Sequence, residues 1–547
     1  MEQLRLFLAI GLSFIVLVIW SMYFGGRSQA PVDPEDAAVS SQQEVAKPET
    51  AVEEPPEPIP PVPQPMVPDA EEKQITVRTP YYTATLSTWG ATFHAFVLNQ
   101  YRETAAPDSS EKNLVPQGFT DSVLQSALLR NSLPGLEHAT YAVDVDTDEV
   151  VVGKEKQTVT FTWVSDKGVQ VKKVFGFDPT SYLIDYRVEI ENYGETALHD
   201  ALSLSLRKPV GDTTGYAFTG PSALINNSLE QIKVKKIKDK SEFAGTIQWI
   251  ANDDGYFIYC LVPETPVDGT MKLAVNDQTL VNELVNPDFE IPPGSRKEFS
   301  FYLFMGPKNM DLLNSLGHNL GKALNFGFFN LLAKPFLWVL NKIHTVIPNY
   351  GVAIIVLTLF IKILLWPLGN KSYKSMNDMK KLQPLMLELR EKYKDDKQRM
   401  NQEIMSLYRT YKINPLGGCL PMLLQLPVFF AFYQMLYQAI ELRHAPFFLW
   451  INDLSAPDRL LQFGFSIPFM APPYGIPVLT LIMGATMLLQ QKMAPPPGDP
   501  MQAKMMMLMP IVFTFIFINF SSGLVLYWLV NNVFSICQQY YIQQKCK

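Results

Sequence analysis

The stretch Gly351–Leu368, GVAIIVLTLFIKILLWPL, decides how the rest of the chain is interpreted. It is eighteen residues long and apolar except for Thr358 and a single charge, Lys362. At ~1.5 Å per residue such a helix is roughly 27 Å long, which is enough to cross the hydrocarbon of a bilayer. A lysine inside a span is costly, so it usually faces a partner or a wet cavity. The stretch therefore predicts a membrane helix that carries a functional cation.

Five more apolar runs bring the expected number of membrane spans to six: Leu4–Phe24, Gly417–Ile440, Ile476–Leu489, Met506–Phe520 and Gly523–Gln538. For the first run a cleaved signal peptide is the alternative, because Ser28-Gln29-Ala30 has the small-x-small form of a cleavage site. The apolar core is longer than that of a signal peptide, and Pro31 would directly follow the cut. We therefore expect an uncleaved anchor over residues 1–25.

The region between the anchor and the later spans has a different composition. Residues 28–72 contain eleven prolines with many Glu, Ala and Ser, which predicts a disordered tether over residues 26–74. Residues 75–307 alternate apolar and polar side chains in short runs, most clearly in Tyr182–Ile190. The absence of intervening helical patterns predicts a large antiparallel β-sandwich. Further strand-like runs are Tyr81–Leu86, Thr158–Val164, Val169–Phe175, Ile247–Val262, Met271–Val275 and Lys297–Leu303.

Nothing in the sequence indicates an enzyme. His94, His138 and His199 are isolated, and the four cysteines show no metal-ligand spacing. Nucleotide-binding loops, zinc signatures and nucleophile elbows are absent, so we expect no cofactor and no catalytic site. The net charge of -7 argues against a nucleic-acid binder in general.

A helical segment is expected to join the β-sandwich to the spans, over residues 308–349. In Asp311–Phe329 five leucines share one face, which predicts an amphipathic helix lying in the membrane surface. A helix packed on the β-sandwich is the alternative. The run Leu331–Ile347 is apolar but interrupted by Lys334-Pro335, and we expect it to be interfacial.

A second polar segment, residues 370–413, has the pattern of two coiled-coil helices. Met379, Leu382, Met386, Leu389 and Tyr393 form one series, and Met400, Ile404, Leu407 and Tyr411 form the other. Asp395-Asp396 separates the two series, and Pro384 must kink the first helix or begin a new one. The basic face of such a hairpin could contact lipid headgroups, or dock a ribosome or a client protein.

Loop charges predict the orientation of the spans. Residues 369–415 carry eleven Lys and Arg against six acidic residues, whereas residues 441–475 carry two basic and three acidic residues. The positive-inside rule then places 369–415 in the cytoplasm and 441–475 outside. Both termini, including the short tail 541–547, would be cytoplasmic, and the β-sandwich would lie outside.

Besides Lys362, the later spans contain polar but uncharged residues: Gln425, Gln434, Asn531 and Asn532. An ion-coupled transporter would usually have carboxylates in its spans, and these spans have none. A transporter is therefore the weaker alternative. An envelope receptor that works through its β-sandwich is a second alternative.

Four long motifs resemble the YidC/Oxa/Alb family of membrane protein insertases, in the Gram-negative form with a large periplasmic domain. They are NPLGGCLPMLLQLP (414–427), DDKQRMNQEIMSLY (395–408), ELRHAPFFLWINDLSAPD (441–458) and SSGLVLYWLVNN (521–532). The resemblance covers the whole chain. It implies a core of five helices over residues 350–540 that encloses a hydrophilic groove, and an activity that needs no ATP. Clients would be nascent inner-membrane proteins, received alone or beside the Sec translocon, with ribosomes as further partners.

The resemblance also implies which residues line the groove. Lys362 matches the single groove cation, Thr358 lies one turn before it, and Gln425 matches a polar position on the next core helix. Trp528, which follows Tyr527, matches an aromatic position that contacts clients, and Asn531 lies one turn beyond. One departure is that the family usually has arginine where this chain has Lys362. Lysine keeps the charge but lacks the two-pronged guanidinium, so the resemblance does not support a bidentate ion pair here.

Overall fold

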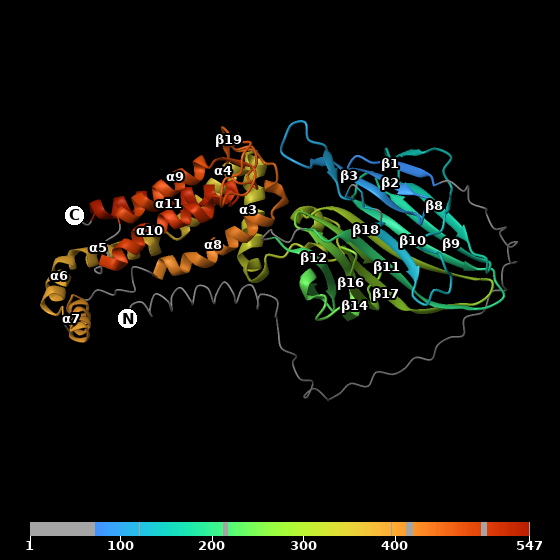
Figure 1. Cartoon of the computed structure of the whole chain (residues 1–547), viewed down its shortest axis with the longest axis horizontal. Coiled ribbons are helices and arrows are strands. Elements are labelled where there is room, and N and C mark those ends of the chain that lie inside the picture. Colours follow the sequence, from blue (N-terminus) through green and yellow to red (C-terminus); the bar gives the residue numbers. More distant parts are fainter. Residues whose placement is uncertain are drawn as a thin grey trace, which may run out of the picture.

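The chain is elongated, with a β-rich part at one end and a helical part at the other (Figure 1). The computed structural model describes residues 72–116, 118–119, 121–211, 217–394, 396–411, 420–493 and 500–545. The predicted anchor (1–25) and nearly all of the predicted tether (26–74) lie outside these residues. We call strands β1 to β18 (residues 74–307) the β domain and residues 330–545 the helical part.

The β domain contains two sheets, one of five strands in the order β4-β3-β2-β1-β7 and one of thirteen strands. The larger sheet has the order β5-β11-β17-β16-β14-β15-β18-β10-β9-β8-β6, and β12 pairs with β14 and β13 beside it. The bounds are β1 Gln74–Arg78, β2 Tyr82–Ser87, β3 Thr92–Arg102, β4 Glu111–Asn113, β5 Leu124–Leu128, β6 Ala142–Val143, β7 Glu149–Val151, β8 Gln157–Val164, β9 Val169–Phe177, β10 Leu183–Asn192, β11 Leu198–Pro209, β12 Thr219–Ile225, β13 Ser228–Gln231, β14 Glu242–Asp254, β15 Phe257–Pro263, β16 Val267–Asn276, β17 Thr279–Ile291 and β18 Ser295–Pro307.

Alternating side chains set the register of these strands. In β10 every second residue is buried, and the strand pairs antiparallel with β9 on one side and β18 on the other. The predicted β-sandwich is thereby confirmed. Two details differ: β1 and β7 pair in parallel, and the run Ile247–Val262 is divided into β14 and β15 by a turn. Gly255 makes this turn possible because its φ of 79° favours glycine.

The segment after the β domain is not the single surface helix that the leucine pattern predicts. It contains α2 (Met310–Ser315) and two 3-10 turns, η2 (Leu320–Lys322) and η3 (Gly327–Phe329). Residues with positive φ at Gly317, His318 and Asn319 end α2, since a helix cannot pass through them. Leu313, Leu320 and Leu324 are buried, and Asn319 and Asn325 bond to Gln248 and Gln231 of the β domain. The segment thus contacts the β domain, as the alternative expected.

The helical part begins with α3 (Asn330–Val346), which runs across the direction of the longer helices at the border with the β domain (Figure 1). The other helices are α4 Tyr350–Leu364, α5 Trp366–Lys381, α6 Gln383–Lys392, α7 Lys397–Thr410, α8 Leu420–Gln438, α9 Val478–Met493, α10 Pro500–Phe517 and α11 Ser522–Lys545. Among the described residues no helix by itself has both the length and the apolar composition to cross a membrane. Helices α4 and α5 have both when taken together.

The opening stretch is bent rather than straight. Helix α4 ends at Leu364, and α5 begins at Trp366 at an angle of 65°. Pro367 lies in the first turn of α5, where its missing amide hydrogen costs nothing, but it prevents α4 from continuing. Residues 366–368 therefore belong to α5 and not to the helix that carries Lys362.

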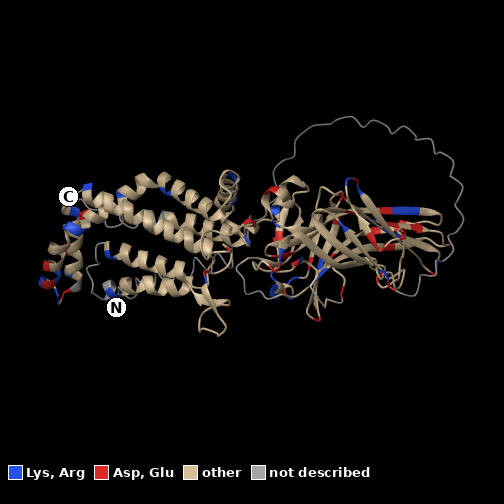
Figure 2. Cartoon of the chain, turned by 90° about the horizontal axis from the view of Figure 1, so that it is seen from above, with Lys and Arg blue, Asp and Glu red and all other residues tan. Residues whose placement is uncertain are grey.

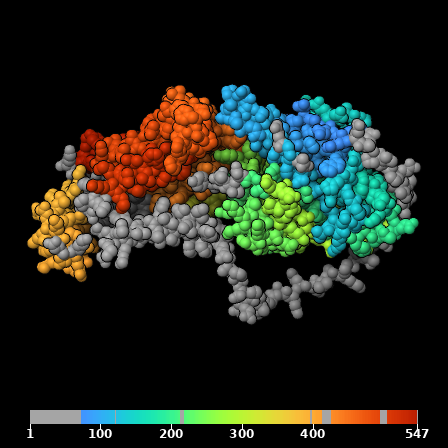
Figure 3. Space-filling view, viewed as in Figure 1, coloured from blue at the N-terminus to red at the C-terminus, as the bar shows by residue number. Residues whose placement is uncertain are grey.

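Beyond α5 the chain forms a hairpin of α6 and α7, which projects from the end of the helical part in Figure 3. Leu382 separates α5 from α6, and Pro384 lies in the first turn of α6. Leu382 and Ile404 are buried, and the Tyr408 hydroxyl donates to the Met386 sulfur at 3.4 Å. Helices α6 and α7 thus contact each other, and at Pro384 a new helix begins, which is one of the two arrangements that the sequence allowed.

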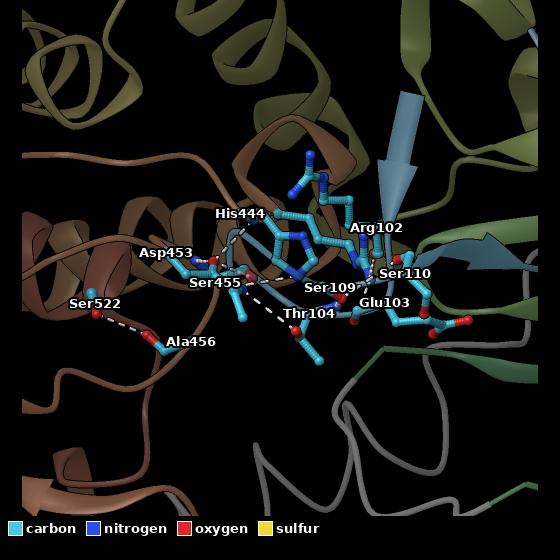
Figure 4. A network of polar contacts seen from close by, with 12 residues as sticks. Arg102, Glu103, Thr104, Ser109, Ser110, His444, Asp453, Ser455, Ala456 and Ser522 are labelled. Atoms are coloured by element: carbon cyan, nitrogen blue, oxygen red, sulfur yellow. Dashed lines mark hydrogen bonds and ion pairs between the residues drawn. The ribbon is translucent and has the colours of Figure 1, made fainter. Parts of the chain in front are cut away.

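The β domain contacts the helical part through the loop after α8 (Figure 4). Arg443 Nη2 donates to the main-chain oxygens of Arg102 (2.7 Å) and Glu103 (3.0 Å), at the end of β3. The Asp453 carboxylate accepts from the main-chain amides of His444 (3.1 Å) and Ser455 (2.8 Å), and this keeps the loop folded. The β domain is thus fastened to the loop that precedes α9.

The same loop continues to the start of α11. The Ser522 amide donates to Ala456 O at 2.7 Å, and the Gly523 amide donates to Leu454 O at 2.9 Å. These bonds satisfy amide groups at the beginning of α11 that have no partner inside the helix. The first turn of α11 is therefore positioned by the loop that also holds the β domain.

A buried ion pair lies where the β domain ends. Lys308 Nζ is 2.7 Å from Asp253 Oδ2, and both side chains are 1% exposed. The next residue, Asn309, caps α2 and donates through Nδ2 to Glu441 Oε1 at 2.9 Å. Separating Lys308 from Asp253 would leave an uncompensated buried charge, which is costly. The pair therefore fixes the position of the chain where it leaves β18.

A second buried lysine, Lys173 of β9, joins the two sheets and gives a prediction for pH dependence. Its amine donates to Gly90 O at 2.7 Å and lies 4.6 Å from the Tyr141 ring centroid. Burial lowers the pKa of Lys173 from 10.5 to about 7. Between pH 7 and 9 the unfolded chain therefore binds a proton that the folded protein lacks, and the free energy of unfolding rises with pH.

In the wild type the free energy of unfolding should rise by up to ~1.4 kcal/mol per pH unit because of Lys173. We expect Lys173→Met to remove this rise. Urea unfolding of the full-length protein in detergent at pH 7, 8 and 9 measures it, and the exposed Lys235→Met is the matched control. If Lys173→Met and the control show the same slope, Lys173 is not a neutral amine in the folded protein.

Candidate functional site

Lys362 contacts α11 through a neutral side chain. Its Nζ donates to Ser535 Oγ at 2.8 Å, and Ser535 Oγ donates to Asn531 O one turn earlier at 2.7 Å. Ser535 is 2% exposed, whereas Lys362 is partly exposed. In the described part of the chain no Asp or Glu lies within ion-pair distance of Lys362. The amine is thus held in place by a neutral partner.

Amide side chains extend this polar cluster to α8. Gln425 Nε2 of α8 donates to Asn531 Oδ1 of α11, and Gln425 also interacts with the Tyr527 hydroxyl. Tyr527 is 3% exposed, and its ring stacks on Phe432 of α8 with centroids 4.4 Å apart. Three helices, α4, α8 and α11, therefore contribute to one polar cluster: Lys362, Gln425, Tyr527, Asn531 and Ser535.

Two expected residues lie beside this cluster rather than in it. The Thr358 hydroxyl donates to Ile354 O of its own helix at 2.7 Å, and Thr358 is 2% exposed. Trp528 packs edge-on against Phe429 with centroids 4.7 Å apart, and it also contacts Phe517 of α10 at 5.1 Å. Trp528 thus belongs to an aromatic cluster where α8, α10 and α11 meet.

Gln538, one turn beyond Ser535, fastens α11 to the bend between α4 and α5. Its Nε2 donates to Trp366 O at 3.2 Å and to Asn370 Oδ1 at 3.1 Å. Gly369 permits this approach, because a Cβ there would lie 2.7 Å from Gln538 Nε2. The polar residues of α11 therefore fix both Lys362 and the bend that follows it.

The sequence interpretation missed Ser535 and Gln538, although a signal for them was present. Asn531, Ser535, Gln538 and Ile542 follow one another at spacings of 4, 3 and 4, which places them on one face of α11. Ser535, Gln538 and Ile542 are all buried. A buried polar stripe along a helix requires polar partners on the facing helices, and α4, α5 and α8 supply them.

The chemistry of this site is electrostatic. Among the described residues no group of His, Cys, Asp and Glu could hold a metal ion. Within the polar cluster the Lys362 amine supplies donors, and the amides and hydroxyls supply both donors and acceptors. Such a site can form hydrogen bonds with polar groups of another chain.

These features define a two-part protein, with a β domain at one end and, at the other, a group of helices that enclose a polar cluster. The family described as YidC periplasmic domain matches residues 74–339, and the family described as 60Kd inner membrane protein matches residues 342–547. Full-length relatives agree with both matches. A membrane protein insertase YidC of Syntrophobacter fumaroxidans is 40% identical over 99% of each chain. That of Syntrophus aciditrophicus is 41% identical over 94% of this chain and 91% of its own.

The chain belongs to the YidC family of membrane protein insertases. It is a protein of the inner membrane whose β domain is periplasmic, and its activity is membrane protein insertion rather than enzymatic catalysis. A crystal structure of an active YidC insertase with its first transmembrane domain resolved is 19% identical, with a TM-score of 0.38. That likeness covers 87% of this chain and 94% of the other.

The contact between Lys362 and Ser535 generates a prediction. Ser535→Ala removes the acceptor that holds the amine, so we expect insertion of a client with an acidic external segment to fall a few-fold, consistent with the loss of one hydrogen bond to a charged group. In a Lys362→Gln background the same substitution should have little further effect, because the hydroxyl acts through the amine. The protease-protected fraction of the client in proteoliposomes measures both.

Thr486→Val is the control for this experiment, since its hydroxyl contacts Asn532 and not Lys362. It should lower insertion equally in both backgrounds or not at all. Equal losses for Ser535→Ala in the two backgrounds would show that Ser535 does not act through Lys362.

Proposed function

We propose that this insertase receives the polar external segment of a client at Lys362, in a hydrophilic groove formed by the five core helices of residues 350–540. The client's apolar helix then leaves the groove sideways into lipid. The groove residues in this proposal are Lys362, Thr358, Gln425, Tyr527, Trp528 and Asn531, together with Ser535. Folding and assembly of clients, alone or beside the Sec translocon, would follow from the same transient contact.

The observation that carries the proposal is the neutral partner of Lys362. A lysine paired with a carboxylate would have to give up that ion pair before it could bind a client, at a cost of several kcal/mol when the pair is buried. A serine hydroxyl holds the amine at 2.8 Å and can be exchanged for a client carboxylate without leaving a second charge exposed to a low dielectric. Lys362 thus stays available as a cation.

The energetics need no nucleotide hydrolysis. A polar segment that enters hydrocarbon without hydrogen-bond partners loses several kcal/mol per group. The amides of Gln425 and Asn531 and the charge of Lys362 offer partners along the way, which lowers this cost. The apolar helix of the client partitions into lipid spontaneously once its polar end has been accommodated.

Charge distribution supports a cytoplasmic position for the helical hairpin of α6 and α7. The hairpin lies at the end of the helices opposite to the periplasmic β domain (Figure 1), and charged residues are few along the helices between these ends (Figure 2). Residues 369–415 carry eleven basic side chains. We therefore propose that residues 370–413 face the cytoplasm, where ribosomes, targeting factors and client chains can dock, and that both termini lie on that side.

A charge series at position 362 tests the electrostatic role. Lys362→Arg should insert a client with an acidic external segment at near the wild-type level, whereas Lys362→Glu should reduce insertion tenfold or more, because two like charges at close range repel. The assay uses purified full-length protein in liposomes with a two-span client, and it compares acidic with neutralised client segments. Lys492→Glu, an exposed charge at the end of α9, is the control.

Normal insertion of the acidic client by Lys362→Glu would contradict the electrostatic proposal. Failure of the wild-type protein to insert any client in liposomes would count against autonomous insertion as a whole.

Removing the β domain separates insertion from an envelope-receptor role. Because residues 310–326 pack on the β domain, the deletion should cover residues 74–326 and leave α3, whose Asn341 Nδ2 reaches Glu441 Oε1 at 3.4 Å. We expect the shortened protein to insert the two-span client at a substantial fraction of the full-length rate. Complete loss of insertion, with α3 to α11 still folded by circular dichroism, would show that the β domain is the working part.

A further inference from the structure

A cleft of about 500 Å³ opens between α5 and α11. The end of α11 that lines it is remote from the β domain (Figure 1). Six residues line it: Trp366, Asn370 and Lys374 from α5, and Tyr541, Ile542 and Lys545 from α11. The polar cluster around Lys362 uses none of these side chains. The cleft is therefore a separate feature of the helical part.

The cleft presents cations and a donor, and its described lining contains no acidic group. Lys374 and Lys545 are exposed, and no Asp or Glu among the described residues lies within ion-pair distance of either. Asn370 Oδ1 already accepts from Gln538, so the Asn370 amide hydrogens remain available to a ligand. Two ammonium groups and one amide donor facing one space match the oxygen atoms of a phosphate group.

Two aromatic side chains place the cleft at the depth of lipid headgroups. The rings of Trp366 and Tyr541 lie 6.3 Å apart between centroids, and Lys545 Nζ lies 5.7 Å from the Tyr541 centroid. Trp and Tyr rings with one apolar and one polar edge concentrate at the boundary between hydrocarbon and water. Tyr540 and Tyr541 are each more than half exposed, and Figure 2 shows charged residues gathering at this end.

An apolar surface adjoins the cleft where α4 ends. Ile363 is 63% exposed and Leu364 is 69% exposed, and they precede Trp366 by three and two residues. A small free anion would leave this apolar surface unused. An amphiphile with an anionic head would use the cations and the apolar surface together, since its head and its tails match the two parts.

We propose that this cleft binds an anionic phospholipid, with its phosphate between Lys374 and Lys545 and its acyl chains along Ile363 and Leu364. The lipid contacts both α5 and α11 near the bend between α4 and α5, where Gln538 of α11 is hydrogen-bonded to Trp366 and Asn370. Bound lipid thereby stabilises the angle between α4 and α5, four residues from Lys362. This assignment holds whether or not Lys362 receives clients.

The test measures lipid binding directly. Purified full-length protein in detergent is titrated with phosphatidylglycerol or with phosphatidylcholine of the same acyl chains, and native mass spectrometry counts the retained lipids. We expect the wild type to retain phosphatidylglycerol selectively and Lys374→Gln/Lys545→Gln to bind it about ten- to thirtyfold more weakly, as the loss of two lysines near an anionic head implies. Lys374→Glu alone should lower the affinity at least as much.

Lys380→Gln/Lys381→Gln is the matched control, because it removes two exposed charges from the same helix outside the cleft. Equal weakening by the control pair and the cleft pair would overturn the site in favour of diffuse surface charge. Displacement of the lipid by millimolar inorganic phosphate would overturn the lipid assignment in favour of a free-phosphate site. Unchanged lipid binding with lost ribosome co-sedimentation would assign the two lysines to the ribosome instead.

Discussion

The helical part depends on one constraint, which is that the buried polar face of α11 must be satisfied by the helices around it. Ser535 and Gln538 are buried and Asn531 is half-buried, and a buried polar group without a partner costs several kcal/mol. Gln425 meets Asn531, Lys362 meets Ser535, and the bend between α4 and α5 meets Gln538. The positions of α4, α5 and α8 around α11 follow from these contacts.

The same constraint explains why a charged residue can remain inside an apolar bundle. The Lys362 amine donates a hydrogen bond to the Ser535 hydroxyl, and this hydroxyl donates a hydrogen bond to the Asn531 carbonyl. Each group in this chain of hydrogen bonds both orients and polarises the next. The amine is therefore fixed in direction, and among the described residues no carboxylate lies within ion-pair distance of it.

The sequence predicted features that depend on local periodicity, and it failed where tertiary contacts or backbone conformation decide. The alternation in Tyr182–Ile190 predicted a strand, and the heptad pattern predicted the pair of α6 and α7. The leucine pattern of Asp311–Phe329 also suggested a helix, but Gly317 and its two neighbours with positive φ divide that segment. Lys362 was recognisable by its charge, whereas the spacing of Ser535 and Gln538 on α11 marks a polar face without showing which helix it meets. The partner of Ser535 becomes visible only when α4 is seen packed against α11.

The contact of Arg443 with the β domain has a consequence for variation. The guanidinium binds two main-chain oxygens at the end of β3, so the side chains of Arg102 and Glu103 contribute nothing to that bond. Substitutions in the hairpin between β3 and β4 can change its surface freely while the path of its backbone is kept. Position 443 has no such latitude, because one nitrogen of its side chain, Nη2, makes both bonds. In this contact the β domain contributes main-chain oxygens, whose position depends on the backbone path, and the helical part contributes one specific side chain, Arg443.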